Sequence, residues 1–295
     1  MATSELGEQA AGAILDCHCH AWRHWPYQPA VPDERSRGAV DLLLHEMDQH
    51  GVQRAAVVCA AIEHNHDNLD YVAWARELHP QRLAMVADLD CSWHDTYHVP
   101  GAAHRLRALD ERYELVGVTH YTAEENDGWL LSEEANAMFA AAAERRLIIS
   151  LGAGPQWQAD LRRLAAVHPT VPVLCHALGV VRAADGVNSE ALAAVLASAA
   201  VPNIYIKVCG FHYCSERGWD YPWRDAVAVF ERIHDAYGAQ RLCWGSDFPA
   251  ATRYCTYRQS LEVVREHCPF LTAADQRLIL CDTFRGLLAT GQPRG

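Results

Sequence analysis

The chain has 295 residues, half of them hydrophobic, and its 37 acidic residues outnumber its 25 basic ones, which gives a net charge of -12. A chain of this length can bury the core of one large α/β barrel or of two ordinary domains. No basic cluster could neutralise a run of phosphates, so we do not expect a nucleic acid partner.

The start of the chain has no basic region followed by an apolar block, and no segment holds about 18 uncharged apolar residues in a row. We therefore expect neither a signal peptide nor a membrane span, and we place the protein in the cytoplasm. A small-molecule substrate is the expected partner, and the sequence leaves open whether the chain forms a homo-oligomer.

Eight short β-rich runs alternate with amphipathic helical stretches, which is the pattern of repeated βα units around a parallel sheet. The expected strands are residues 13–18, 54–60, 82–88, 115–121, 146–152, 171–177, 203–210 and 241–247. Apolar residues at three- and four-residue spacing predict helices between them, for example at 41–51, 132–146, 158–169 and 224–238. No linker divides the chain. We therefore predict one domain over 1–295, a (β/α)8 TIM barrel at about 13–271 with a helical tail at 272–295. A doubly wound sheet is the alternative.

The first strand ends in an unusual sequence, Asp16-Cys-His-Cys-His20. Because strand side chains alternate, we expect Asp16, His18 and His20 on one face. Cys17 and Cys19 would then point the other way, toward the helices. Two imidazoles at the end of a strand can converge on one metal ion, whereas zinc–thiolate sites normally need cysteines spaced so that the chain bends back on itself, which one extended strand does not provide. We therefore expect the histidines, and not the cysteines, to be ligands.

Two later strands also end in side chains that can bind a metal ion or transfer a proton. Strand six ends at His176, and strand eight ends at Asp247, just before Phe-Pro. The active sites of parallel barrels lie at the carboxyl ends of the strands, so His18, His20, His176 and Asp247 are predicted to share one cavity. Any one of these histidines is more often a hydrogen-bonded core residue than a ligand, but four such groups at one end favour a shared site.

Cysteine and lysine usage narrows the chemistry further. The 11 cysteines are odd in number and form no C-x-x-C pair, so we expect most of them to be free, buried thiols. Lys207 is the only lysine, and it is therefore the only candidate for chemistry that needs a lysine amine.

Four segments carry a family resemblance: D-x-H-x-H at 16–20, VPVLCHALG at 171–179, NIYIKVCG at 203–210 and RLCWGSDFP at 241–249. They resemble the amidohydrolase superfamily, and within it the amidohydrolase-related (amidohydrolase 2) branch of TIM-barrel hydrolases, which includes sugar-acid and pyrone dicarboxylate lactonases. The resemblance runs over nearly the whole chain. It implies a distorted (β/α)8 barrel and one divalent metal ion, with zinc expected and His18, His20, His176 and Asp247 as its ligands.

The chain departs from the family pattern at two strand ends. Strand five ends with Ser150-Leu-Gly, where metal-dependent relatives usually carry a histidine. Strand four ends with Gly-Val-Thr-His120, where many lactonase relatives have Gly-Val-Arg, so a partner for a substrate carboxylate is missing. The pyrone dicarboxylate lactonase works without a metal, so the resemblance leaves metal-independent catalysis open as well.

These features predict a hydrolase that acts on a small cyclic organic acid or lactone. With a metal, the water bound to it would ionise near a pKa of about 7, and Asp247 would be the general base. Without a metal, the histidines, His176 included, would polarise the carbonyl while Asp247 activates water. Aromatic and basic residues near the mouth suit binding of such a substrate, although they could also form a packed rim. They are Trp22, His120, Tyr121, Trp157, His212 and Arg253, with Tyr213 and Trp219 nearby.

Three other functions stay open at this point. A metal-dependent, non-oxidative decarboxylase of an aromatic or unsaturated acid would use a similar site and release carbon dioxide. A Schiff-base lyase would require Lys207. A binding barrel whose catalytic site has decayed would explain the missing ligand at strand five.

Overall fold

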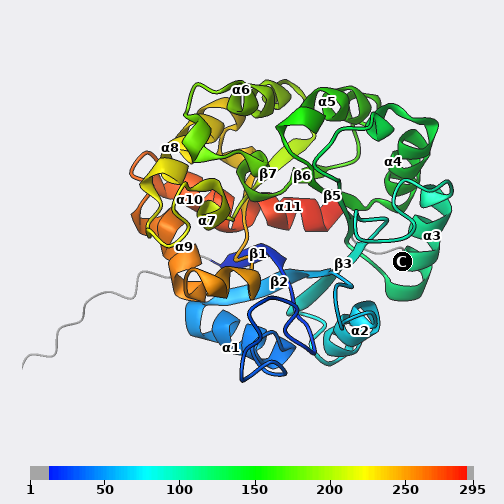
Figure 1. Ribbon diagram of the computed structural model, residues 1–295, viewed down its shortest axis with the longest axis horizontal. Helices are drawn as coiled ribbons and strands as arrows, with labels where there is room; N and C mark the ends of the chain where they lie inside the picture. Colours follow the sequence, from blue (N-terminus) through cyan, green and yellow to red (C-terminus); the bar gives the residue numbers. More distant parts are fainter. Residues whose placement is uncertain (1–12, 291–295) are drawn as a thin grey trace, which may run out of the picture.

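The computed structural model describes residues 13–290, which form an eight-stranded parallel sheet with the strands in chain order (Figure 1). The strands are β1 (Ile14–Cys19), β2 (Val52–Cys59), β3 (Leu83–Asp88), β4 (Gly117–Tyr121), β5 (Ile148–Gly152), β6 (Val173–Cys175), β7 (Ile204–Val208) and β8 (Leu242–Trp244). All eight predicted strands are present, and the predicted (β/α)8 barrel is confirmed.

Helices surround the strands on the outside (Figure 1). They are α1 (Val40–His50), α2 (Asn68–Leu78), α3 (Ala102–Tyr113), α4 (Glu133–Arg145), α5 (Gln158–Val167), α6 (Glu190–Ala197), α8 (Arg224–Tyr237) and α9 (Tyr257–Glu266), and a short helix, α7 (Phe211–Cys214), follows β7. Up to residue 290, the predicted tail consists of α10 (Ala273–Arg277), a π-helical turn (Leu278–Asp282) and α11 (Thr283–Thr290), and residues 291–295 lie outside the described part of the chain. Phe284 and Leu288 of α11 pack against the inward-facing Leu15 of β1, so this helix covers one end of the barrel interior.

The two ends of the sheet, β1 and β8, meet through the backbone of the residues that carry the predicted site. The Asp247 amide donates to the carbonyl of His18 at 2.9 Å, and the His20 amide donates to the carbonyl of Phe248 at 2.5 Å. Gly245 makes this approach possible, because a Cβ atom there would lie 2.7 Å from the Cβ of His18. The same contact that joins β1 to β8 therefore brings the histidines to Asp247.

The predicted face assignment on β1 is wrong for Asp16 and Cys17, because the strand contains a bulge. The prediction holds for His18 and His20, which share the cavity side, and for Cys19, which packs toward the helices. Asp16 pairs with Ala55 and Cys19 pairs with Val57, so three steps along β1 oppose two steps along β2. The extra residue reverses the alternation, and Cys17 and His18 both face the barrel interior. Asp16 points the other way, toward Tyr257 of α9.

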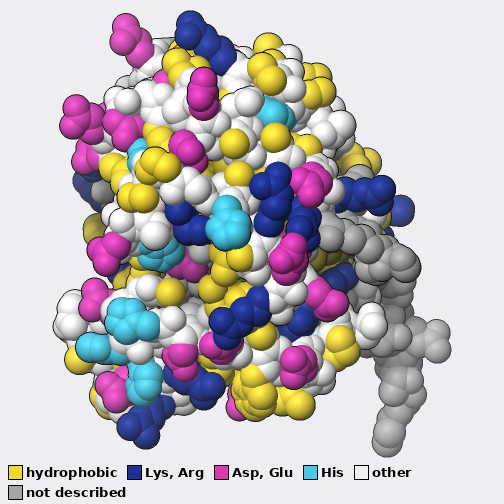
Figure 2. All heavy atoms as spheres, turned by 90° about the vertical axis from the view of Figure 1, so that its right-hand side faces the viewer, with side chains coloured by type: hydrophobic (Ala, Val, Ile, Leu, Met, Phe, Trp, Pro, Cys, Tyr) yellow, Lys and Arg dark blue, Asp and Glu magenta, His cyan; other side chains and the backbone are white. Residues whose placement is uncertain are grey.

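The cysteines are free and buried, as predicted. No helix within residues 13–290 is long and apolar enough to cross a membrane. On the face shown in Figure 2, basic and acidic side chains are intermixed rather than gathered by sign.

Replacing Gly245 by alanine should destabilise the protein by about 1–3 kcal/mol, because the new methyl group would overlap His18 at the β1/β8 contact. Denaturant unfolding measures this difference. Gly286→Ala in α11 is the matched control, since nothing lies within 4 Å of its added Cβ, and alanine favours a helix. Equal stability of the two variants would show that the close approach at Gly245 is not required.

Candidate active site at the carboxyl ends of the strands

Asp247 lies at the centre of the site, in a left-handed backbone conformation with φ of 54°. Its Oδ1 lies 3.5 Å from Nε2 of His18 and 3.8 Å from Nε2 of His20. Its Oδ2 is buried without a hydrogen-bond partner among the described residues. Burial raises the pKa of Asp247 above its usual value, and electrostatic interactions with His20 and His212 oppose this only in part.

His20 is held with a lone pair directed at Asp247. Its Nδ1 lies 3.0 Å from the carbonyl of Val58, and because a carbonyl only accepts, Nδ1 must carry the proton. The ring stacks on Trp22 with 4.7 Å between centroids, and the Trp22 indole donates to the carbonyl of Ala60. Trp22 therefore orients His20. Burial lowers the pKa of His20 to about 3, so the ring is neutral and Nε2 is free to bind an electrophile.

The three side chains fit a single divalent cation. One ligand atom each from His18, His20 and Asp247 lies within 4.8 Å of the others, and all three residues are buried. The lone pair on His20 faces a carboxylate oxygen, and the second oxygen of Asp247 has no donor. Two imidazoles and one carboxylate in the wall of a cavity form a donor set that suits zinc.

His176 lies beside this group but turns its Nε2 elsewhere. The ring is 4.7 Å from that of His18, yet Nε2 lies 2.6 Å from Oγ of Ser150 and 3.2 Å from Nζ of Lys207. Ser150 thus occupies the end of β5, where the family pattern has a histidine, and it binds His176. The proposed roles of His176 as ligand and catalyst stay predictions.

Lys207 lies beneath the site, within the barrel. Its side chain is buried, its amine donates to Ser150 at 2.7 Å, and Nζ lies 3.1 Å from Nδ1 of His18. Burial lowers its pKa. Because Lys207 is not part of the cavity wall and its amine already contacts three site residues, a Schiff base with substrate has no geometric support.

Asp16 acts outside the cavity. Its Oδ1 accepts from the backbone amides of His18 and Ser246 at 3.0 Å, and its Oδ2 accepts from the Tyr257 hydroxyl at 3.1 Å. A single buried carboxylate thus ties together the ends of β1 and β8 and helix α9. Burial raises its pKa to about 6.

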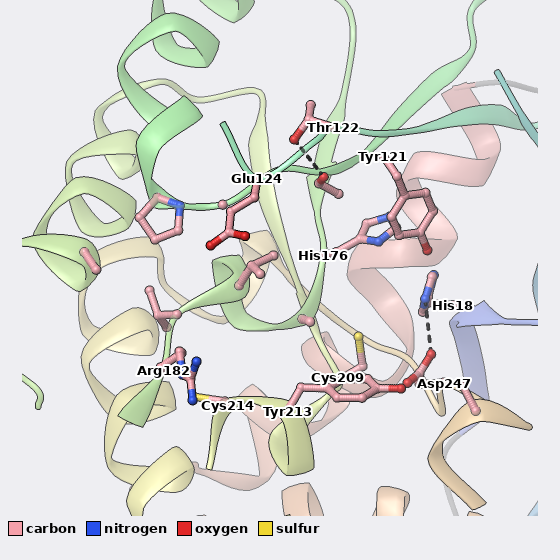
Figure 3. Close-up of a pocket in the computed structure, with 18 of the residues that line it drawn as sticks. His18, Tyr121, Thr122, Glu124, His176, Arg182, Cys209, Tyr213, Cys214 and Asp247 are labelled. Carbon is pink, nitrogen blue, oxygen red and sulfur yellow. Dashed lines mark hydrogen bonds and ion pairs between the residues drawn. The ribbon is translucent and has the colours of Figure 1, made fainter. Parts of the chain in front are cut away.

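The site opens into a cavity of about 960 Å³ (Figure 3). Of the predicted residues, those in its wall are His18, His20, Tyr121, His176 and Asp247. The structure adds Glu124, Arg182 and Asp185, which the sequence did not assign to substrate binding, and no motif in the sequence marks them. Tyr213, which was expected near the mouth, and Tyr27 of the first loop also line the cavity.

The other predicted substrate-binding residues lie behind the wall. His120 follows the inward-facing Thr119 and points outward, where its Nδ1 contacts the carbonyl of Leu89 at 3.0 Å. The Trp157 indole donates to the carbonyl of Ala123 at 3.1 Å. Each residue supports a segment that borders the cavity, and neither side chain is part of the cavity wall.

His212 and Arg253 stand close to the site without forming its wall. Nε2 of His212 is 3.8 Å from Oδ2 of Asp247, on the side away from the cavity. Arg253 donates to the Tyr213 hydroxyl at 2.9 Å and lies over the ring of Tyr27 at 4.1 Å. Arg253 therefore fixes two tyrosines that do line the cavity.

Comparison with known proteins identifies relatives of this architecture. Residues 15–287 match the sequence profile of a family described as amidohydrolase. The fold is similar to that of a probable 2-pyrone-4,6-dicarboxylic acid hydrolase from Acinetobacter baumannii with bound citric acid, at 19% identity and a TM-score of 0.73, over 94% of this chain and 99% of that one.

Two further solved structures share the fold. An amidohydrolase from Burkholderia multivorans with bound zinc has 18% identity and a TM-score of 0.74, with 94% of this chain and 99% of that one covered. The 2,6-dihydroxybenzoate decarboxylase from Rhizobium has 14% identity and a TM-score of 0.64, with the same coverage of 94% and 99%. No curated protein sequence matches this chain.

Asp247→Asn should raise the thermal stability of chelator-treated protein by a few degrees at neutral pH. The folded state holds a proton on this carboxyl more tightly than the unfolded state does, so stability is lost as pH rises through the raised pKa. Asparagine carries no charge and tolerates a left-handed φ. Melting temperatures across pH 3–8 test this; the gain should shrink below about pH 4, the unfolded pKa. A variant less stable than the wild type at neutral pH would contradict it.

Proposed function

Because this chain belongs to the amidohydrolase family, we propose that it is a hydrolase that directs water onto the carbonyl carbon of a small cyclic organic acid or lactone. Family membership supports an enzyme, and the choice of hydrolysis rests on the site itself. The observation that carries it is the buried Asp247 in the cavity wall. Its Oδ1 lies near two imidazoles, and its Oδ2 has no hydrogen-bond donor among the described residues, with Nε2 of His212 3.8 Å away.

Asp247 is placed to take a proton from water. Its raised pKa brings the carboxylate closer to the pH of the medium, which makes it a better base than an exposed aspartate. In the proposed reaction the water oxygen bonds to the carbonyl carbon while Asp247 accepts the proton. The ring C–O bond then breaks, and Asp247 returns the proton to the leaving oxygen, so the acid and the alcohol are formed together.

Zinc is the metal that we propose for His18, His20 and Asp247, where it would lower the pKa of water and polarise the carbonyl. The residues of the chain perform the other tasks. Tyr27, Tyr121 and Tyr213 face the same cavity, and burial raises the pKa of each phenol, so all three are neutral hydroxyls that can donate to a carbonyl oxygen.

The cavity suits a ring-shaped substrate. Its volume of about 960 Å³ accommodates a small organic molecule, and its wall combines aromatic rings with a few polar groups. The solved relative with bound citric acid and the name of a pyrone dicarboxylate hydrolase support an organic acid as the substrate class. The Rhizobium decarboxylase shares the fold, so release of carbon dioxide is the outcome that would assign the chain to the other reaction type.

Asp247→Asn should lower kcat by about 10²- to 10⁴-fold, because asparagine cannot accept a proton. The assay is turnover of a panel of lactones and aromatic acids by zinc-loaded and by chelator-treated protein, with metal content measured in each. If Asp247 acts chiefly as a ligand, the variant should lose bound zinc, and activity should return in part at high zinc concentration.

The matched control is Asp95→Asn, an exposed carboxylate that is not part of the cavity wall, which should leave kcat unchanged. A variant with Asn at position 247 that retains both near wild-type kcat and full metal content would rule out the mechanism in either form.

A further inference from the structure

One guanidinium lies in the cavity at the end away from the catalytic residues. Among the described residues of the cavity wall, Arg182 is the only lysine or arginine. Figure 3 shows Arg182 and Glu124 on one side of the cavity, with His18 and Asp247 on the other. A substrate that reaches Asp247 with its carbonyl can therefore extend toward Arg182 with another group.

The Arg182 side chain is free to bind that group. It is exposed, and within residues 13–290 no side chain or carbonyl forms a hydrogen bond or ion pair with its guanidinium. The Glu124 and Asp185 carboxylates line the same cavity, yet neither is paired with it. A guanidinium presents five donors in a planar fork that matches the two oxygens of a carboxylate.

The backbone before Arg182 is unusual and fixes its position. Ala177, Leu178, Gly179 and Val180 follow His176 with φ values of 41°, 55°, 75° and 58°. Consecutive left-handed residues are costly, because each side chain crowds the following carbonyl. Packing holds the turn in place, since a Cβ atom on Gly179 would lie 2.7 Å from Cγ1 of Val195 in α6. The packed turn begins directly after His176 and therefore fixes the backbone position from which the Arg182 side chain extends.

The charges around Arg182 limit what the cavity can accept. Three carboxylates line it, those of Glu124, Asp185 and Asp247, against this one guanidinium. One substrate carboxylate can pair with Arg182. A second would face carboxylates without a free cation in the described wall, and like charges at close range in a partly desolvated site repel strongly.

We propose that Arg182, presented by the left-handed turn 177–180, binds the single carboxylate of the substrate and selects monocarboxylates over dicarboxylates. This supplies, from the segment after β6, the carboxylate partner that the end of β4 lacks. The inference rests on the proposed function for the identity of the site, but its test uses binding alone.

The probes are phthalide-5-carboxylate, its neutral carboxamide and a phthalide dicarboxylate, which share the lactone ring and differ in charge. Binding is measured by calorimetry in the Asp247→Asn background, where hydrolysis of the probe is slowed and the Glu124 and Asp185 carboxylates remain in the cavity wall. Arg182→Met, with similar length and no charge, should weaken the monocarboxylate by about 10- to 100-fold and leave the carboxamide within about twofold. Arg163→Met, at an exposed arginine on α5, is the matched control and should change neither.

The dicarboxylate should bind at least about tenfold more weakly than the monocarboxylate when Arg182 is present. Gly179→Ala tests the turn: it should weaken the monocarboxylate more than the carboxamide, because it displaces Arg182, with which only the carboxylate forms an ion pair. Equal binding of monocarboxylate and carboxamide by the Asp247→Asn protein, or tighter binding of the dicarboxylate, would overturn the inference. Selective binding without turnover of any lactone by the wild type would support it and contradict the proposed function.

Discussion

The contact between β1 and β8 is the interaction on which the rest of the site depends. Gly245 lets the two strands approach, and the backbone bond from Asp247 to His18 fixes their relative positions. The bulge in β1 then turns His18 inward, while the buried carboxylate of Asp16 ties the same strand ends to α9. His18 and Asp247 are therefore brought together where the barrel closes, and the contact between β1 and β8 fixes the distance between them.

Burial then determines the chemistry of the assembled groups. Desolvation lowers the pKa of His18 and His20 and raises that of Asp247, so neutral imidazoles face a carboxyl group with an unsatisfied oxygen. Burying these groups lowers the stability of the fold, and binding of a cation or a polarised water molecule would stabilise them. Lys207 lies beneath it and engages Ser150, where the family pattern has a metal ligand.

The fold and the inner site could be predicted because they depend on local signals: strand runs, turn residues, and histidines and an aspartate at strand ends. The faces of Asp16 and Cys17 on β1 could not be predicted, because the bulge that reverses them depends on the pairing of β1 with β2. Side chains do alternate along β4. Because Tyr121 faces inward, alternation would have excluded its neighbour His120 from the predicted substrate-binding residues. Arg182 was missed because a left-handed turn held by Val195 decides where it lies, and nothing local in the sequence shows that packing.

The most direct test of water attack on a carbonyl is isotope incorporation. The substrate that the wild type turns over fastest is incubated in H₂¹⁸O, and the product is analysed by mass spectrometry. Hydrolysis at the carbonyl predicts one ¹⁸O atom in the carboxylate that is formed and none in the leaving hydroxyl. A product without label, accompanied by carbon dioxide, would contradict the hydrolase and assign the site to decarboxylation.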